Sequence, residues 1–141
     1  MLEILVAIVV LSLGMLGLAG LQAATLRNNQ IAYYRTIAVL QTYATADRIR
    51  ANQAGAAAGA YNNLMAMTPA DPDCVTNVCN PANMAVADHS QWNANNARML
   101  PGGVGTVAVV AGGRQFDITV RWQENTEQGG VGQQLVTRVQ P

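Results

Sequence analysis

The sequence predicts an α+β fold, in which one long N-terminal α-helix packs on a small antiparallel β-sheet. Three patterns predict this fold: an apolar run near the N-terminus, a following stretch with helical periodicity, and a C-terminal segment in which apolar and polar residues alternate. The length of 141 residues suits one globular domain of this kind plus a membrane or assembly segment.

The first element is an uncharged apolar run of eighteen residues, 4–21, in which Ser12 is the one polar side chain. This length is typical of a transmembrane helix. A cleaved signal peptide is the alternative, but such a peptide has a basic start, and the only early charge here is Glu3. The sequence therefore predicts a retained membrane-spanning half of the helix over residues 1–24.

Four residues of this segment are not explained by a plain lipid anchor. Glu3 places a carboxylate at the N-terminal end of the predicted membrane span, where an unpaired charge is costly. The alternative is that this side chain simply reaches the lipid headgroups. Gly14, Gly17 and Gly20 each lower helix propensity by about 1 kcal/mol relative to Ala. They also thin one flank of the helix, which permits close packing against another helix. We therefore take these four as candidate residues for subunit assembly.

Residues 25–52 are expected to continue the helix as an amphipathic half. They contain neither Pro nor Gly until residue 52, and Tyr33, Ile37, Leu40 and Ala44 recur on one helical face. We expect this face to cover the sheet, and we expect the Gly-containing stretch that follows to end the helix.

The remaining residues, 53–141, are expected to form a globular domain whose first part, 53–103, is rich in loops. Asp-Pro, Asn-Pro and Pro-Gly pairs interrupt regular structure there. One short helix is predicted over 87–98, with Asp88 or Ser90 as its N-cap.

The second part of this domain, 104–141, predicts a three-stranded antiparallel meander. Its strands are expected over 106–111, 115–123 and 133–139, with a hairpin turn at Gly112-Gly113. The middle strand has the clearest alternation, and it places four apolar side chains on one buried face: Phe116, Ile118, Val120 and Trp122.

Cys74 and Cys79 have four residues between them in a Pro- and Asp-rich loop. Outside the cytoplasm, a disulfide is the default interpretation of such a pair. A zinc site is the alternative, because the sole histidine, His89, follows, but zinc requires at least three protein ligands. Asp71 and Asp73 flank a proline and indicate a turn, with a weak calcium loop as the alternative.

No catalytic constellation is present in the sequence. A histidine-based triad would depend on His89, which we expect in an exposed, Asn-rich loop. Gly102-Gly103-Val104-Gly105 lacks the Lys-Ser/Thr that completes a phosphate-binding loop. The sequence therefore predicts neither an enzyme nor a cofactor, a metal site or a small-molecule substrate.

The charge balance disfavours a nucleic-acid-binding protein. All eight basic residues are arginine, and eight carboxylates balance them to a net charge of zero. Direct DNA binding is kept as an alternative, because four arginines lie in the globular half: Arg98, Arg114, Arg121 and Arg138.

The N-terminal segment MLEILVAIVVL (1–11) resembles the start of a mature type IV pilin, in which two apolar residues precede a glutamate and a long apolar run. Met1 and Leu2 match the two apolar residues, and Glu3 matches the glutamate. Further segments are similar to PilV-type minor pilins: LSLGMLGLAGLQAATLR (11–27), ADRIRAN (46–52), Trp92, LPGG (100–103) and Val-Arg-Trp (120–122).

The resemblance implies an inner-membrane protein with a periplasmic globular domain, which is later extracted and stacked into an extracellular pilus. It implies partners of three kinds, namely other minor pilins, the major pilin and a tip adhesin, with which the chain forms a tip or initiation complex. Glu3 would then compensate the N-terminal amine of an adjacent subunit, and the three glycines would permit local unwinding of the helix. Minor pseudopilins of type II secretion share the N-terminal signature, so they are the alternative, as is a DNA-uptake pilin.

Overall fold

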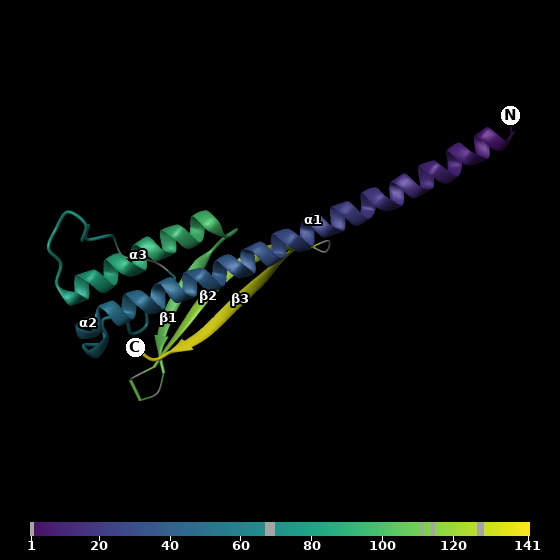
Figure 1. The fold of residues 1–141 in the computed structure, drawn as a ribbon. Helices are drawn as coiled ribbons and strands as arrows, with labels where there is room; N and C mark the ends of the chain where they lie inside the picture. Colours follow the sequence, from purple (N-terminus) through teal and green to yellow (C-terminus); the bar gives the residue numbers. More distant parts are fainter. Residues whose placement is uncertain (1, 67–69, 111, 114, 127–128) are drawn as a thin grey trace. The chain divides into compact units, whose positions relative to one another are not determined.

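The computed structural model describes residues 2–66, 70–110, 112–113, 115–126 and 129–141. Its elements are, in order, α1 (Leu2–Ala51), α2 (Gln53–Ala57), α3 (Pro81–Met99), β1 (Val104–Val109), β2 (Phe116–Thr126) and β3 (Gly129–Val139) (Figure 1). The predicted α+β class, with a long apolar N-terminal helix and a small antiparallel sheet, is confirmed. The chain divides into two compact units, Met1–Tyr33 and Tyr34–Pro141, which we describe separately.

The N-terminal unit consists of the first part of α1. Every side chain from residue 2 to residue 26 is exposed. An 18-residue window of α1 has a mean hydropathy of 2.7, and none of that window is buried. By length and composition this helix is able to cross a membrane and to act as an anchor.

The globular unit has two layers, a sheet and a pair of helices. The sheet has the order β1-β2-β3, with antiparallel neighbours, which confirms the predicted meander. Residues 34–51 of α1 and the whole of α3 lie side by side over one face of this sheet (Figure 1). The predicted covering of the sheet by residues 25–52 is therefore shared with α3.

The inner face of the sheet carries the predicted alternation. Phe116, Ile118, Val120 and Trp122 are all buried, so this prediction is confirmed. The strands differ from the predicted ranges at their ends, because β1 begins at Val104 and β2 and β3 extend toward each other beyond residues 123 and 133.

The buried face of α1 differs from the predicted one. Within the globular unit it consists of Ala38, Thr42, Thr45, Ala46 and Ile49. Tyr33 and Leu40 are instead 58% and 57% exposed, Ala44 is also exposed, and Ile37 is only half-buried. Most of these buried side chains are small, and α1 is joined to α3 by a hydrogen bond in which Trp92 Nε1 donates to the Gln41 carbonyl at 3.0 Å.

The helix α3 begins earlier than predicted, at Pro81. Asn80 is its N-cap, and the side-chain oxygen of Asn80 accepts from the backbone N–H of Asn83 at 2.8 Å. Proline suits the first helical position because its missing N–H needs no partner there. Asp88 and Ser90, the predicted caps, therefore lie inside the helix.

The helix α3 packs closely against β1 at Gly105. The Asn93 side chain accepts from the Gly105 N–H at 2.6 Å and donates to the Gly105 carbonyl at 3.0 Å. A Cβ atom at Gly105 would lie 2.3 Å from the Trp92 ring. Glycine is therefore required here, because the strand backbone touches a buried aromatic ring.

His89 is not in an exposed loop, as predicted, but lies within α3 and is 2% exposed. Its Nε2 lies 2.9 Å from Asn93 Nδ2, which is a hydrogen-bond donor, so Nε2 accepts and the ring is neutral. Burial lowers the pKa of His89 below 6.5.

We therefore expect the free energy of unfolding to fall as the pH drops below about 6.5, because the unfolded chain binds a proton that the folded chain rejects. Above about pH 6.5, His89 is neutral in both the folded and the unfolded chain, so its effect on the free energy of unfolding no longer changes with pH. Urea unfolding of wild type and His89→Gln between pH 7 and pH 5 measures this effect. Equal pH dependence in the two proteins would contradict the assignment.

Candidate functional site

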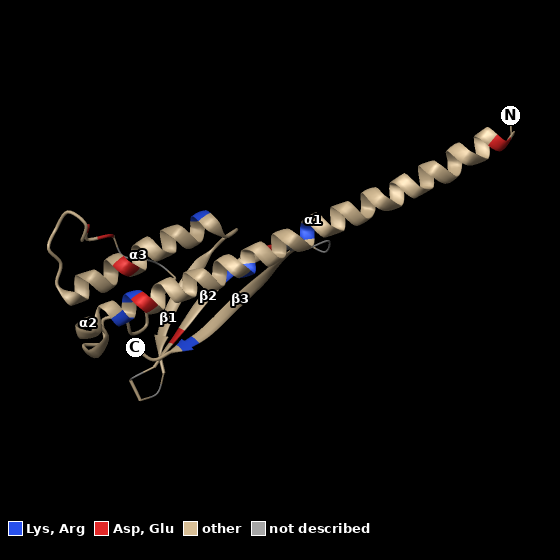
Figure 2. Ribbon diagram, viewed as in Figure 1, with Lys and Arg blue, Asp and Glu red and all other residues tan. Residues whose placement is uncertain are grey.

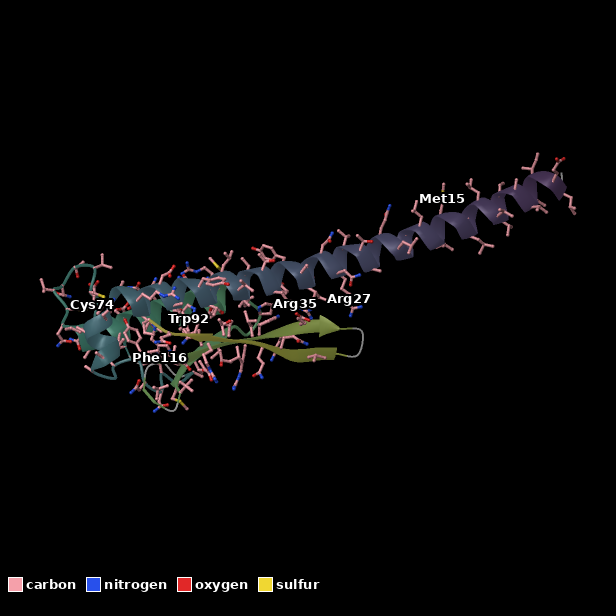
Figure 3. All side chains as sticks on the ribbon, turned by 60° about the horizontal axis from the view of Figure 1, so that its bottom comes forward. Met15, Arg27, Arg35, Cys74, Trp92 and Phe116 are labelled. Carbon is pink, nitrogen blue, oxygen red and sulfur yellow. A yellow bond between two sulfur atoms is a disulfide. The ribbon has the colours of Figure 1, made fainter. Side chains whose placement is uncertain are left out.

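The candidate site is the apolar segment of α1, residues 2–26, and its main property is exposure on all sides. Its side chains project around the whole circumference of the helix, as Figure 3 shows near Met15. A helix that is apolar all round is normally buried in a membrane or among other helices. Eighteen residues of helix extend about 27 Å, close to the thickness of the bilayer hydrocarbon.

The hydroxyl groups in and beside this segment are satisfied within the helix itself. Ser12 Oγ donates to the carbonyl of Ile8 at 2.7 Å, and Thr25 Oγ1 donates to that of Leu21 at 2.9 Å. An unpaired hydroxyl in an apolar medium costs free energy, and these internal bonds remove that cost. The segment is therefore compatible with lipid and with a packed helix bundle alike.

Glu3 lies in the first turn of α1, and the apolar segment carries no other charge (Figure 2). A carboxylate is favourable near a helix N-terminus because it faces the positive end of the helix dipole. Gly14, Gly17 and Gly20 lie along the same segment, and a Cβ atom at any of them would meet nothing within 4 Å in the described chain. The chain itself thus gives no packing reason for glycine at these positions.

A second feature is the disulfide between Cys74 and Cys79, which the sequence predicts for a domain outside the cytoplasm. The bond closes the exposed loop that precedes α3, with Cα atoms 5.4 Å apart. Disulfides persist in oxidising compartments and are rare in the cytosol. The bond therefore favours a globular unit on the non-cytoplasmic side of a membrane.

Replacing both cysteines with serine is expected to lower the free energy of unfolding by about 2 kcal/mol, because the closed loop is short. Membrane insertion should be unchanged, since the apolar segment is not involved. Urea unfolding and membrane fractionation of the double variant measure these two effects. Labelling of two free thiols in the unreduced wild-type protein would contradict the prediction.

The four arginines behind the DNA-binding alternative do not share one surface as far as the structure describes them. Arg98 lies in the last turn of α3, over the inner face of the sheet, whereas Arg121 and Arg138 lie on the outer face. The Arg138 guanidinium binds the Asp117 carboxylate through two hydrogen bonds of 2.8 and 2.9 Å. This contact lowers the pKa of Asp117 and raises that of Arg138. Arg114 lies outside the described residues.

A buried polar network ties the end of α1 to α3. The Tyr61 hydroxyl donates to Asp88 at 2.6 Å and accepts from the Asn52 amide at 3.1 Å. Arg48 binds the other oxygen of Asp88 at 3.2 Å. Burial and the hydrogen bond to Asp88 raise the pKa of Tyr61 well above 10. These polar side chains bind one another through hydrogen bonds and an ion pair, so we assign the network a structural role.

A second connection, between α1 and β2, was not predicted from the sequence. Glu124 is 3% exposed, and its Oε1 accepts from Arg35 Nε at 3.3 Å and from Trp122 Nε1 at 3.2 Å. Glu124 is in phase with Phe116 and Trp122 on the inner face, so the alternation contained a signal for a buried acid. The arginine partner has no such signal, because it is 89 residues distant in the chain.

No protein-family model, no curated protein and no solved structure matches this chain. In the part of the chain that the structure describes, no three His, Cys, Asp or Glu side chains come together as metal ligands. The apolar segment, Glu3 and the disulfide are therefore the features of this chain that bear on its function.

Proposed function

We propose that this chain is a minor pilin of a type IV pilus, which assembles through the apolar segment of α1 into a tip or initiation complex that primes the filament. Before assembly it is held in the inner membrane by this segment, with the globular unit in the periplasm. After assembly it is displayed outside the cell. Its partners are other minor pilins, the major pilin and a tip adhesin.

The observation that carries the proposal is an apolar helix surface without internal partners, with one carboxylate at its start. Lipid alone would satisfy the apolar side chains, but it offers no counter-ion to Glu3 and no reason for three glycines. A bundle of such helices explains both features. Glycine lets helices approach closely, and a carboxylate in the bundle requires a cation, for which the N-terminal amine of a neighbouring subunit is the candidate.

The globular unit supports the same proposal. Residues 34–51 of α1 are tied to the sheet by the Arg35–Glu124 ion pair and to α3 by the Trp92–Gln41 hydrogen bond, so the helix that carries the apolar segment continues into a folded globular unit. The disulfide suits a head that folds in the periplasm. The resemblance of residues 1–27 to type IV pilins is the reason for choosing a pilus among possible helix-bundle assemblies.

The proposal is tested by chemical crosslinking in the native cells, followed by separate isolation of inner membranes and sheared surface filaments. We expect crosslinks to other minor pilins in the membrane and a small amount of the chain in the filaments. The matched control replaces residues 4–21 with an unrelated single-span segment, which should remain anchored but lose these crosslinks. Crosslinks to components of a type II secretion system, or equal crosslinking of the control, would contradict the proposal.

A further inference from the structure

The disulfide-closed loop before α3, which we call the disulfide loop (residues 71–79), presents two valines to solvent. Val75 is 84% exposed and Val78 is 104% exposed. Among the described residues of the globular unit, no other large apolar side chain is as exposed as these two. Two such exposed apolar side chains on one short loop leave apolar area available for a partner.

The disulfide loop is held in shape before any partner arrives. Besides the Cys74–Cys79 bond, the Asp73 carbonyl accepts from the backbone N–H of Asn77 at 3.0 Å. The Asp73 carboxylate accepts from the N–H and the hydroxyl of Thr76, and Asp71 accepts from the N–H of Asp73 at 2.9 Å. A preorganised loop loses little conformational entropy when it docks.

The disulfide loop also carries negative charge. Asp71 and Asp73 are exposed, and within the described part of the chain neither carboxylate has an ion pair. The valines are therefore bordered by two negative charges. Such a tip fits an apolar recess that has a cation at its rim.

A recess of this kind is present at the other end of the same unit. It has a volume of about 500 Å³ and lies largely on the outer face of the sheet; we call it the Arg121 groove. It is lined by Gly102, Val104, Arg121, Gln123, Gly132 and Gln134. The two glycines leave space, the glutamine amides offer donors and acceptors to a peptide loop, and Arg121 is exposed with no ion pair to any described residue.

The two valines of the loop and most of the groove lie near opposite ends of α3. Val78 is two residues before the N-cap Asn80, the groove residues from Gly102 onward follow Met99, and nineteen helical residues extend about 28 Å. Ala66, which precedes the loop in the chain, also lines the groove. We propose that the disulfide loop of one copy docks into the Arg121 groove of a second copy. Because the two surfaces differ, the contact is head-to-tail and propagates into a row of subunits. The proposal does not depend on the assignment to a pilus.

The test uses the purified full-length chain in detergent, with a photoreactive residue in place of Val78 (Val78→p-benzoylphenylalanine). We expect a crosslinked dimer whose adduct maps by mass spectrometry to residues 101–134. The matched control carries the same group in place of Tyr43, which is 58% exposed on α1 and outside both surfaces. This control should give no adduct in that range.

Arg121→Glu is expected to lower the yield of the Val78 crosslink about fivefold, because it replaces the attraction to Asp71 and Asp73 with repulsion. Arg98→Glu makes the same change of charge on the other side of the sheet and should leave the yield unchanged. A Val78 yield no greater than that of the Tyr43 control would overturn the proposal. An adduct outside residues 101–134, or an Arg121→Glu yield equal to wild type, would do the same.

Discussion

Glu3→Ala is expected to lower incorporation into filaments by at least about tenfold, while the chain still accumulates in the inner membrane. In a packed helix bundle the carboxylate balances a buried cation, and its removal leaves that cation unpaired at a cost of several kcal/mol. Insertion should be unchanged or slightly improved, because an acid near the bilayer interface is mildly unfavourable. Quantitative blotting of sheared filaments and inner membranes measures both amounts.

Two companion variants separate charge from shape at this position. Glu3→Gln keeps the size and most hydrogen bonds of the side chain but removes the charge, so it should share the assembly defect. Ser12→Ala removes the one polar side chain of the run at 4–21, whose hydroxyl is already bonded to the Ile8 carbonyl, and should assemble normally. Normal filament incorporation of Glu3→Ala would show that the glutamate is merely solvated among headgroups.

Gly105→Ala is expected to lower the free energy of unfolding of the globular unit by about 3 kcal/mol. The new methyl group would lie 2.3 Å from the buried Trp92 ring and 2.7 Å from the Asn96 amide, so α3 and β1 must move apart. That movement also weakens the two hydrogen bonds from Asn93 to the Gly105 backbone. Urea unfolding followed by circular dichroism measures the loss.

Gly132→Ala is the matched control, because it adds the same atom to a strand where nothing lies within 4 Å. It should be neutral or slightly stabilising, since alanine has less backbone freedom to lose on folding. Trp92→Leu in the Gly105→Ala background should recover part of the loss, which a double-mutant cycle reveals as a coupling between the two positions. Equal stability of Gly105→Ala and wild type would contradict the close approach of α3 and β1.

The parts of the fold that follow from local pattern were predictable from the sequence. The alternation from Phe116 to Trp122 needs only one buried sheet face, and the apolar run at 4–21 needs only composition. Both features are present in the structure, as β2 and as the exposed part of α1. The candidate assembly surface, residues 2–26 of α1, was predictable as well, because its apolar character belongs to one continuous segment of the chain.

The parts that depend on how elements pack were not predictable in this way. The spacing of Tyr33, Ile37 and Leu40 suggested a buried face of α1, but Tyr33 and Leu40 are exposed. Ala38 and Thr42, one and five residues after Ile37, are buried instead. Asn80-Pro81 suggested a break in regular structure. The same pair instead caps and begins α3, whose following residues bury one face against the rest of the globular unit.

Residues with a role in close packing gave still weaker signals. Gly105 stands in a Gly-rich stretch that is typical of a loop, and only the position of the Trp92 ring explains why it is glycine. His89 lies among asparagines, which usually indicate exposure, but here Asn93 and Asn96 are buried with it on one face of α3. A polar composition does not reveal which polar groups are paired with a neighbouring strand.

The central claim is that the apolar segment of α1 packs against the helices of other subunits and is more than a lipid anchor. A photoreactive residue in place of Met15, which is 62% exposed in the middle of that segment, tests it most directly. In sheared filaments, illumination should give protein adducts that map to the N-terminal helices of other pilin subunits. Adducts with lipid alone, at normal levels of the chain in the inner membrane, would contradict the claim.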